Sequence, residues 1–218
     1  MPHISFTDGT QQAVQTIYCI GRNYAKHAIE LKNAVPDEPV VFLKPAASII
    51  QHQESIVIPR QSNDVHHEVE LVLCIGKKTK NVSRKAALSY INGVGIGIDV
   101  TARDLQSKAK KAGKPWSIAK GFDTFAPVSS FQKTDISTTY HQTEVELFVN
   151  DELRQSGNTK DMLFPVPFLI QYLSEIFTLY PGDLIFTGTP EGVGPIQPGD
   201  VLRATLNNPK SELEVSVS

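Results

Sequence analysis

The strongest constraint on this chain comes from three acidic residues placed in runs that otherwise have the composition of buried β-strands. Glu68 and Glu70 lie two residues apart in one run, and Asp99 ends another. Since side chains alternate between the faces of a strand, we expect Glu68 and Glu70 to share a face, roughly 6–7 Å apart. A buried carboxylate costs free energy unless it is paired or bound to a metal. Three such oxygen donors would suit Mg²⁺ or Mn²⁺ and leave positions open for water and substrate.

The alternative is that both glutamates occupy the solvent face of an amphipathic strand. The next residue on that face, Val72, is apolar. Asp99 follows Gly95 and Gly97, which would let backbone or a ligand approach closely. Spacing alone therefore leaves the metal site and the solvent-facing strand equally open.

Short strand-like runs separated by turn signals dominate the chain and favour a β-rich α+β fold over a doubly wound α/β sheet. Besides the acidic runs, we expect strands over 17–20, 40–43, 55–58, 144–149, 152–154, 184–186 and 201–204. Helices are expected over 24–31, 101–112 and 167–179. A chain of 218 residues is expected to form one domain, spanning 1–218.

The overall composition points away from several classes of partner. A net charge of −2 with no basic patch argues against nucleic acid, and no apolar run reaches the ~18 residues of a membrane span. The N-terminal residues lack the pattern of a signal peptide. Cys19 and Cys74 lie in apolar strand-like runs and are expected to be buried free thiols. We therefore expect a cytoplasmic protein with no nucleic-acid or membrane partner.

Two further features could carry chemistry. His27 and Glu30 are three residues apart in a short helix, so the carboxylate could hold one imidazole nitrogen while the other takes a proton. The alternative is a surface pair without function. Lys120 is flanked by apolar and small residues, which indicates either a partly buried ammonium with an anionic partner or a lysine at a strand edge.

Two weaker patterns lie nearby. His66 and His67 are consecutive, so in a strand they face opposite ways and cannot both bind one ion. The glycine-rich segment 187–194 follows a strand, and its backbone amides could bind an anion or form only a turn.

Taken together and in order, six segments of this chain resemble the fumarylacetoacetate hydrolase superfamily. They cover about residues 15 to 210 and comprise Gly21-Arg22-Asn23-Tyr24 with His27 and Glu30, Phe42-Leu43-Lys44-Pro45, His67-Glu68-Val69-Glu70-Leu71 with Ile75-Gly76, Asp99-Val100-Thr101-Ala102-Arg103-Asp104 with Gln106, Lys120-Gly121-Phe122-Asp123, and Thr187-Gly188-Thr189-Pro190 with Gly192-Val193-Gly194. The small size is most like the acylpyruvate hydrolases of that superfamily.

The resemblance implies a fold and a set of site residues. The fold is a rolled mixed β-sheet with a few short helices, in a homodimer. The metal, Mg²⁺ or Mn²⁺, would be held by Glu68, Glu70 and Asp99. The implied catalytic residues are His27, Glu30 and Lys120, and the implied substrate-binding residues are Arg22, Arg103, Gln106 and Thr189.

The activity implied first is metal-dependent hydrolysis of an acylpyruvate, such as acetylpyruvate or fumarylpyruvate, at the C3–C4 bond. His27, oriented by Glu30, would activate a water that attacks the 4-carbonyl, and the metal and Lys120 would stabilise the departing pyruvate enolate. The same site could instead decarboxylate oxaloacetate or interconvert its keto and enol forms. It could also belong to an isomerase or decarboxylase of aromatic-degradation intermediates, or to a non-catalytic protein that binds a keto acid.

Overall fold

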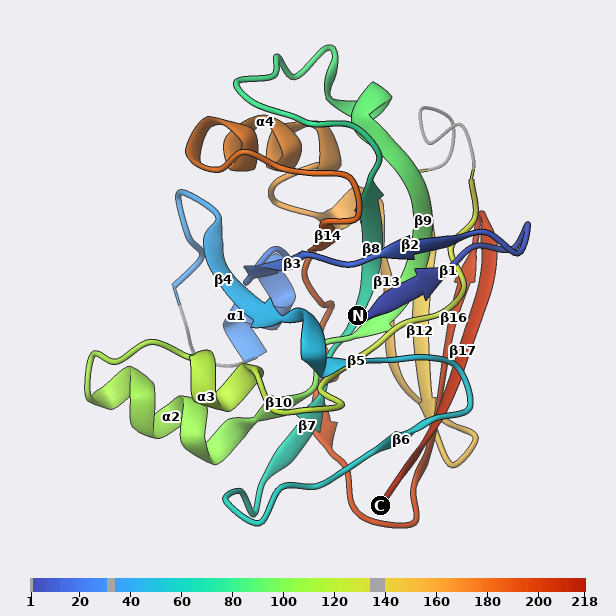
Figure 1. Cartoon of the computed structure of the whole chain (residues 1–218). Helices are drawn as coiled ribbons and strands as arrows, with labels where there is room; N and C mark the ends of the chain where they lie inside the picture. The colour runs from blue at the N-terminus through green and yellow to red at the C-terminus, as the bar shows by residue number, and fades with distance from the viewer. Residues whose placement is uncertain (1, 31–33, 134–139) are drawn as a thin grey trace.

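Two five-stranded mixed β-sheets contain most of the strand residues in the computed structural model, which describes residues 2–30, 34–133 and 140–218 (Figure 1). The first sheet has the order β4 (Val40–Pro45), β3 (Thr16–Gly21), β14 (Leu184–Phe186), β8 (Val69–Ile75) and β9 (Ile91–Ile98). The second has the order β13 (Glu152–Asn158), β12 (Glu144–Val149), β16 (Val201–Asn207), β17 (Lys210–Val217) and β6 (Ser55–Ile56). Within these sheets only the β14–β3 and β17–β6 pairs are parallel.

Smaller sheets and four α-helices complete the described part of the chain. The small sheets pair β1 (His3–Ser5) with β2 (Gln11–Ala13), β10 (Thr101–Ala102) and β15 (Gly194–Pro195) with β7 (Val65–His67), and β11 (Ala126–Pro127) with β5 (Ile49–Ile50). The α-helices are α1 (Ala25–Glu30), α2 (Arg103–Lys111), α3 (Ser117–Lys120) and α4 (Val166–Ile176). Short 3₁₀ turns cover η1 (Ala46–Ser48), η2 (Ala87–Tyr90) and η4 (Thr159–Asp161). The expected β-rich α+β fold is confirmed.

Strand β8 lies at the centre of the core, and all seven of its residues are buried. Leu71 and Leu73 belong to the larger apolar cluster, which also takes the inward side chains of β12, β16 and β17 and so joins the two sheets. Val72 and Cys74, on the opposite face of β8, belong to a second cluster with Phe131. Because both faces of β8 are covered, the acidic residue on this strand is enclosed by protein.

Gly95 and Gly97 on β9 make room for packed side chains, which corrects the expectation that they let backbone or a ligand approach closely. A Cβ on Gly97 would lie 2.8 Å from side-chain atoms of Phe186 and Val72. A Cβ on Gly95 would lie 3.0 Å from Ser129 Oγ and 3.4 Å from the ring of Phe131. The second cluster therefore fills the space that side chains at these positions would occupy.

Element boundaries differ from the expectations in a few places. The helix expected over 101–112 begins at Arg103, because Thr101–Ala102 form β10 and pair with β7. The strand expected over 55–58 contains only Ser55–Ile56, and the helix expected over 167–179 spans Val166–Ile176. The hairpin strand expected over 152–154 extends to Asn158. The helix expected over 24–31 spans Ala25–Glu30, and residue 31 lies outside the described residues.

Cys19 and Cys74 are buried free cysteines, as expected. Within the described residues, no helix combines the length and the apolar character that crossing a bilayer requires.

Candidate active site and metal centre

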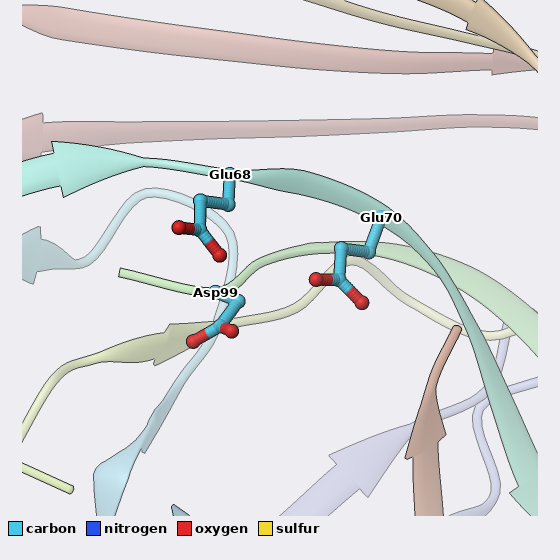
Figure 2. A group of neighbouring side chains, drawn as sticks. All are labelled: Glu68, Glu70 and Asp99. Carbon is cyan, nitrogen blue, oxygen red and sulfur yellow. The ribbon is translucent and has the colours of Figure 1, made fainter. Parts of the chain in front are cut away.

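Three buried carboxylates meet where β9 ends and β8 begins (Figure 2). Glu70 is on β8, Asp99 directly follows β9, and Glu68 lies between β7 and β8. The placement of Glu68 corrects the expectation of a single strand carrying both glutamates, because the ladder breaks there and the Glu68 carbonyl accepts the Asp99 N–H at 2.8 Å. One carboxylate oxygen from each residue nevertheless lies within 4.8 Å of the others.

Three basic side chains neutralise part of this cluster. Lys120 Nζ donates to Glu68 Oε2 at 2.8 Å and to Asp99 Oδ2 at 2.5 Å, and Arg103 pairs with Glu68 Oε1. Lys44 Nζ lies 2.7 Å from Asp99 Oδ1. Burial lowers the pKa of Lys120, but the carboxylates of Asp99 and Glu68 outweigh it, so the pKa is raised and the ammonium stays charged. Lys120 ends helix α3, so it is the buried, partnered ammonium and not a strand-edge lysine.

Glu70 is the member of the triad that has no basic partner among the described residues. Its Oε2 accepts only the backbone N–H of Gly188, at 2.6 Å. Burial and repulsion by Asp99 and Glu68 outweigh that hydrogen bond and raise the pKa of Glu70 well above 4.5. Glu70 therefore lacks the positive counter-charge that basic side chains provide to Glu68 and Asp99.

The donor set fits a hard divalent cation. Three carboxylate oxygens at this spacing are the ligands that Mg²⁺ and Mn²⁺ prefer, and they leave positions free for water or a substrate. A cation between them would supply the counter-charge that Glu70 lacks. The triad is thus suited to hold a divalent metal ion.

A histidine–glutamate pair lies on the same cavity. His27 Nδ1 is 3.4 Å from Glu30 Oε2, and His27 is only 4% exposed. Burial lowers the pKa of His27 below 6.5, although the carboxylates of Glu68 and Glu30 raise it in part. The imidazole is therefore neutral at pH 7, and a proton on Nδ1 facing Glu30 leaves Nε2 as the basic nitrogen.

The glycine-rich segment 187–194 binds the protein's own anions. Gly188 N–H donates to Glu70, and Gly192 N–H donates to both carboxylate oxygens of Glu30 at 3.1 and 3.2 Å. Gly192 has φ +92°, and a Cβ there would lie 2.2 Å from the carbonyl oxygen of Arg154, so only glycine fits. The backbone amides of the loop therefore donate hydrogen bonds to carboxyl groups on α1 and β8.

The cavity brings together nearly all the residues that the sequence singled out. Its lining includes the triad and the six expected residues Arg22, His27, Arg103, Gln106, Lys120 and Thr189. Glu30 is outside the lining and contacts the His27 side chain that lines it. Five residues that line the cavity were not assigned to the site from the sequence, namely Ile20, Gly21, Phe42, Lys110 and Trp116.

Gln155, from the second sheet, was also missed, and it joins two walls of the site. Its Oε1 accepts the backbone N–H of Val69 at 3.1 Å and its Nε2 donates to the carbonyl of Pro190 at 3.0 Å, which fixes the orientation of the amide. Nε2 therefore also donates to Thr189 Oγ1, at 2.8 Å. The hydroxyl hydrogen of Thr189 is then free to donate to a ligand oxygen.

The side-chain amide of Gln155 also determines which ring nitrogen of His67 carries the proton. Gln155 Oε1 is 2.8 Å from His67 Nδ1, so Nδ1 carries the proton. Burial lowers the pKa of His67 to about 4, so the ring is neutral at pH 7. His66 instead pairs with Asp64 at 2.8 Å, and neither histidine belongs to the carboxylate cluster.

The sequence matches the model of a known protein family and is similar to proteins named for oxaloacetate chemistry. Residues 16–217 match the family model described as fumarylacetoacetate (FAA) hydrolase C-terminal. The mitochondrial oxaloacetate tautomerase FAHD1 of Arabidopsis thaliana is 49% identical, over 97% of this chain and 92% of that protein. The mitochondrial oxaloacetate decarboxylase of Dictyostelium discoideum is 45% identical, over 92% of this chain and 93% of that protein.

A solved structure is similar over nearly the whole fold. The crystal structure of fumarylpyruvate hydrolase from Pseudomonas aeruginosa in complex with Mn²⁺ and pyruvate matches with a TM-score of 0.94 and 33% identity. The match covers 99% of this chain and 94% of that one.

Proposed function

The chain belongs to the fumarylacetoacetate hydrolase family, and from this premise we propose that it is a divalent-metal-dependent enzyme that interconverts the keto and enol forms of oxaloacetate. One observation carries the proposal: His27, a buried neutral imidazole, lines the same cavity as the carboxylate triad and the ammonium of Lys120. A base beside fixed positive charge is what proton removal next to a carbonyl requires.

The residues take distinct parts in this reaction. His27 Nε2 takes a proton from C3, and the electron pair of that C–H bond moves to the C2 oxygen as the C2–C3 double bond forms. Lys120 and Arg103 stabilise the negative charge on that oxygen, which then accepts a proton from water to give the enol, while His27 returns its proton to water. Glu30 stabilises the imidazolium that forms transiently at His27.

A divalent ion at Glu68, Glu70 and Asp99 would act as a Lewis acid that lowers the pKa of the C3 protons. We propose Mg²⁺ or Mn²⁺, because the triad offers only oxygen ligands. The Mn²⁺ named in the related hydrolase complex supports this choice.

The expectation that acylpyruvate hydrolysis is the main activity is less well supported than oxaloacetate chemistry. Two relatives named for oxaloacetate chemistry align with more than nine-tenths of this chain at 45–49% identity. The structural relative named as a fumarylpyruvate hydrolase is 33% identical. Hydrolysis remains a second candidate, because a water held near His27 could be activated by the same base.

The products distinguish these activities. Purified protein with Mn²⁺ is incubated with oxaloacetate and, separately, with acetylpyruvate, and NMR follows the species present. Faster equilibration of enol and keto oxaloacetate, lost with EDTA and in His27→Ala, supports the proposal. Faster release of pyruvate and CO₂ with no faster equilibration would instead identify a decarboxylase. Equal amounts of acetate and pyruvate from acetylpyruvate, with no effect on oxaloacetate, would identify a hydrolase.

Two further expectations remain proposals. We expect a homodimer, and the exposed apolar side chains of Leu43 and Ile118 on the neighbouring elements β4 and α3 support an interface there. Light scattering of the purified protein tests it, and a monomeric mass would contradict it. A cytoplasmic location is proposed as well, and fractionation of the source cells tests it.

A further inference from the structure

Two cationic side chains on the cavity wall have no carboxylate partner in the part of the chain that the structure describes. The basic residues that line the cavity are Arg22, Arg103, Lys110 and Lys120. Arg103 and Lys120 pair with the triad. Arg22 and Lys110 make no ion pair, and Arg22 Nε is buried without a hydrogen-bond partner. The pair is therefore available to an anion that enters the cavity.

These two residues come from different elements and are held close to one another. Arg22 lies in the turn after β3 with φ +59°, a left-handed conformation that costs free energy for a residue other than glycine. Lys110 is in the last turn of α2, with Nζ 5.2 Å from the centroid of the Trp116 ring. Burial, together with repulsion by Arg22 and Arg103, lowers the pKa of Lys110 to about 8. Like charges gathered in this way favour a bound counter-ion.

An ordinary explanation exists for a lysine in this place, because basic residues stabilise the C-terminal end of a helix. Lys108 and Lys111 fit that explanation, since both are exposed on the same helix. Lys110 differs from them because it is half-buried and lines the cavity. The helix end alone therefore does not account for its position.

The charge balance of the cavity favours a dianion. Four basic side chains and three carboxylates line it, and His27 is neutral. With a divalent cation on the triad, the lining would carry three positive charges in excess. A ligand with two carboxylates offsets more of this charge than a ligand with one.

We propose that Arg22 and Lys110 bind the second carboxylate of a dicarboxylic 2-oxo acid and so hold the C4 carboxylate of oxaloacetate during the reaction. The inference rests on the proposed function and deepens it, because it names the residues that select the substrate class. It also assigns a role to Lys110, which no sequence pattern indicated.

The same contact determines which reaction oxaloacetate undergoes. In decarboxylation the C3–C4 bond breaks, its electron pair forms the C2–C3 double bond, and the negative charge of the C4 carboxylate passes to the C2 oxygen as neutral CO₂ leaves. In tautomerisation a proton leaves C3 and the C4 carboxylate keeps its charge. Cations at that carboxylate stabilise the ground state of decarboxylation more than its transition state. Arg22 and Lys110 therefore suppress loss of CO₂ and favour the tautomerase.

Kinetics of Arg22→Gln and Lys110→Gln test the assignment, with Lys111→Gln as the matched control on the same helix. We expect KM for oxaloacetate to rise about tenfold in each cavity variant, because each loses one charge-assisted hydrogen bond to the substrate. The ratio of pyruvate formed to enol interconverted is expected to rise several-fold. Lys111→Gln should leave both quantities unchanged. An unchanged KM and an unchanged ratio in both cavity variants would overturn the proposal.

A binding measurement tests the same assignment without turnover. Malate and lactate both carry a 2-hydroxy acid group, and malate adds the C4 carboxylate. Calorimetry with the Mn²⁺-loaded protein should show tighter binding of malate, with the preference lost in Arg22→Gln and Lys110→Gln and kept in Lys111→Gln. Absence of the preference in the wild type would overturn the inference. Presence of the preference in a protein that does not act on oxaloacetate would instead refute the proposed function while keeping this subsite.

Discussion

Lys44 Nζ lies 2.7 Å from Asp99 Oδ1, and both side chains are buried. The same ammonium donates to the backbone carbonyls of Val100, Lys120 and Phe125 at 2.9, 2.5 and 2.8 Å. One lysine on β4 therefore orients a triad carboxylate and also anchors the end of helix α3, which carries Lys120. Lys44 therefore supports both Asp99 of the candidate metal site and Lys120, the cation that would stabilise the enolate.

Replacing this lysine is expected to damage both stability and metal binding. Lys44→Met removes the ion pair with Asp99 and leaves three backbone carbonyls without their donor, so we expect a loss of about 3–5 kcal/mol in the free energy of unfolding. Urea denaturation measures it, and calorimetry should show weaker Mn²⁺ binding. The control is Lys133→Met, which breaks the exposed Lys133–Asp8 pair and should change stability far less. Equal losses in the two variants would contradict the role of Lys44.

Metal affinity should rise with pH. In the metal-free protein the raised pKa of Glu70 favours its protonated form, and a divalent ion must displace that proton. Because the folded chain keeps a proton that the unfolded chain loses near pH 4.5, Glu70 destabilises the metal-free protein as pH rises above 4.5. Calorimetry in buffers of different ionisation enthalpy should show proton release on Mn²⁺ binding as the pH is lowered toward 4.5. Binding without proton release would refute this role of Glu70 in the triad.

The pH dependence of activity should report a histidine that titrates below its ordinary range. Because burial lowers the pKa of His27, its basic form persists to more acidic pH, and the rising limb of kcat/KM should lie below pH 6.5. His27→Ala should reduce kcat by roughly 10²–10⁴-fold and abolish that limb. Glu30→Gln should keep the rising limb but lower kcat, because the imidazolium loses its charged partner. A rising limb that survives in His27→Ala would assign the base to another group.

Gln155 should affect substrate binding although it lies outside the cavity lining. Gln155→Leu removes the donor to Thr189 Oγ1 and the acceptor for Val69 N–H, so we expect a higher KM and a stability loss of about 1–3 kcal/mol. Gln155→Glu keeps the acceptor and loses the donor. It should therefore raise KM with a smaller loss of stability. If both variants have the KM of the wild type, Gln155 has no positioning role.

Most of the site was predictable because its residues are unusual for their surroundings. Glu70 and Asp99 stand out as acids in apolar strands, and spacing and surroundings indicated His27, Glu30 and Lys120. The family resemblance supplied four further residues that line the cavity, Arg22, Arg103, Gln106 and Thr189. The break in the strand at Glu68 was not predictable, because it depends on the pairing of β7 with β10 and β15, which are distant in sequence.

The residues that were missed carry no local sign of their role. Gln155 sits in an otherwise exposed stretch of β13, and only the approach of the second sheet brings it to Thr189 and Val69. Lys110 resembles any basic residue at a helix end. Lys44 also carries no sign in the sequence, and only the structure shows that it is buried while its neighbour Leu43 is 45% exposed, the reverse of the order that hydrophobicity predicts. Such an inversion marks a lysine with buried partners.

The most direct test of the tautomerase activity follows the enol form of oxaloacetate by its ultraviolet absorbance after mixing with the protein. We predict that the Mn²⁺-loaded protein speeds the approach to the keto–enol equilibrium, and that EDTA or His27→Ala returns the rate to that of buffer. An equilibration rate equal to that of buffer, with the metal bound and the protein folded, would contradict the proposed function.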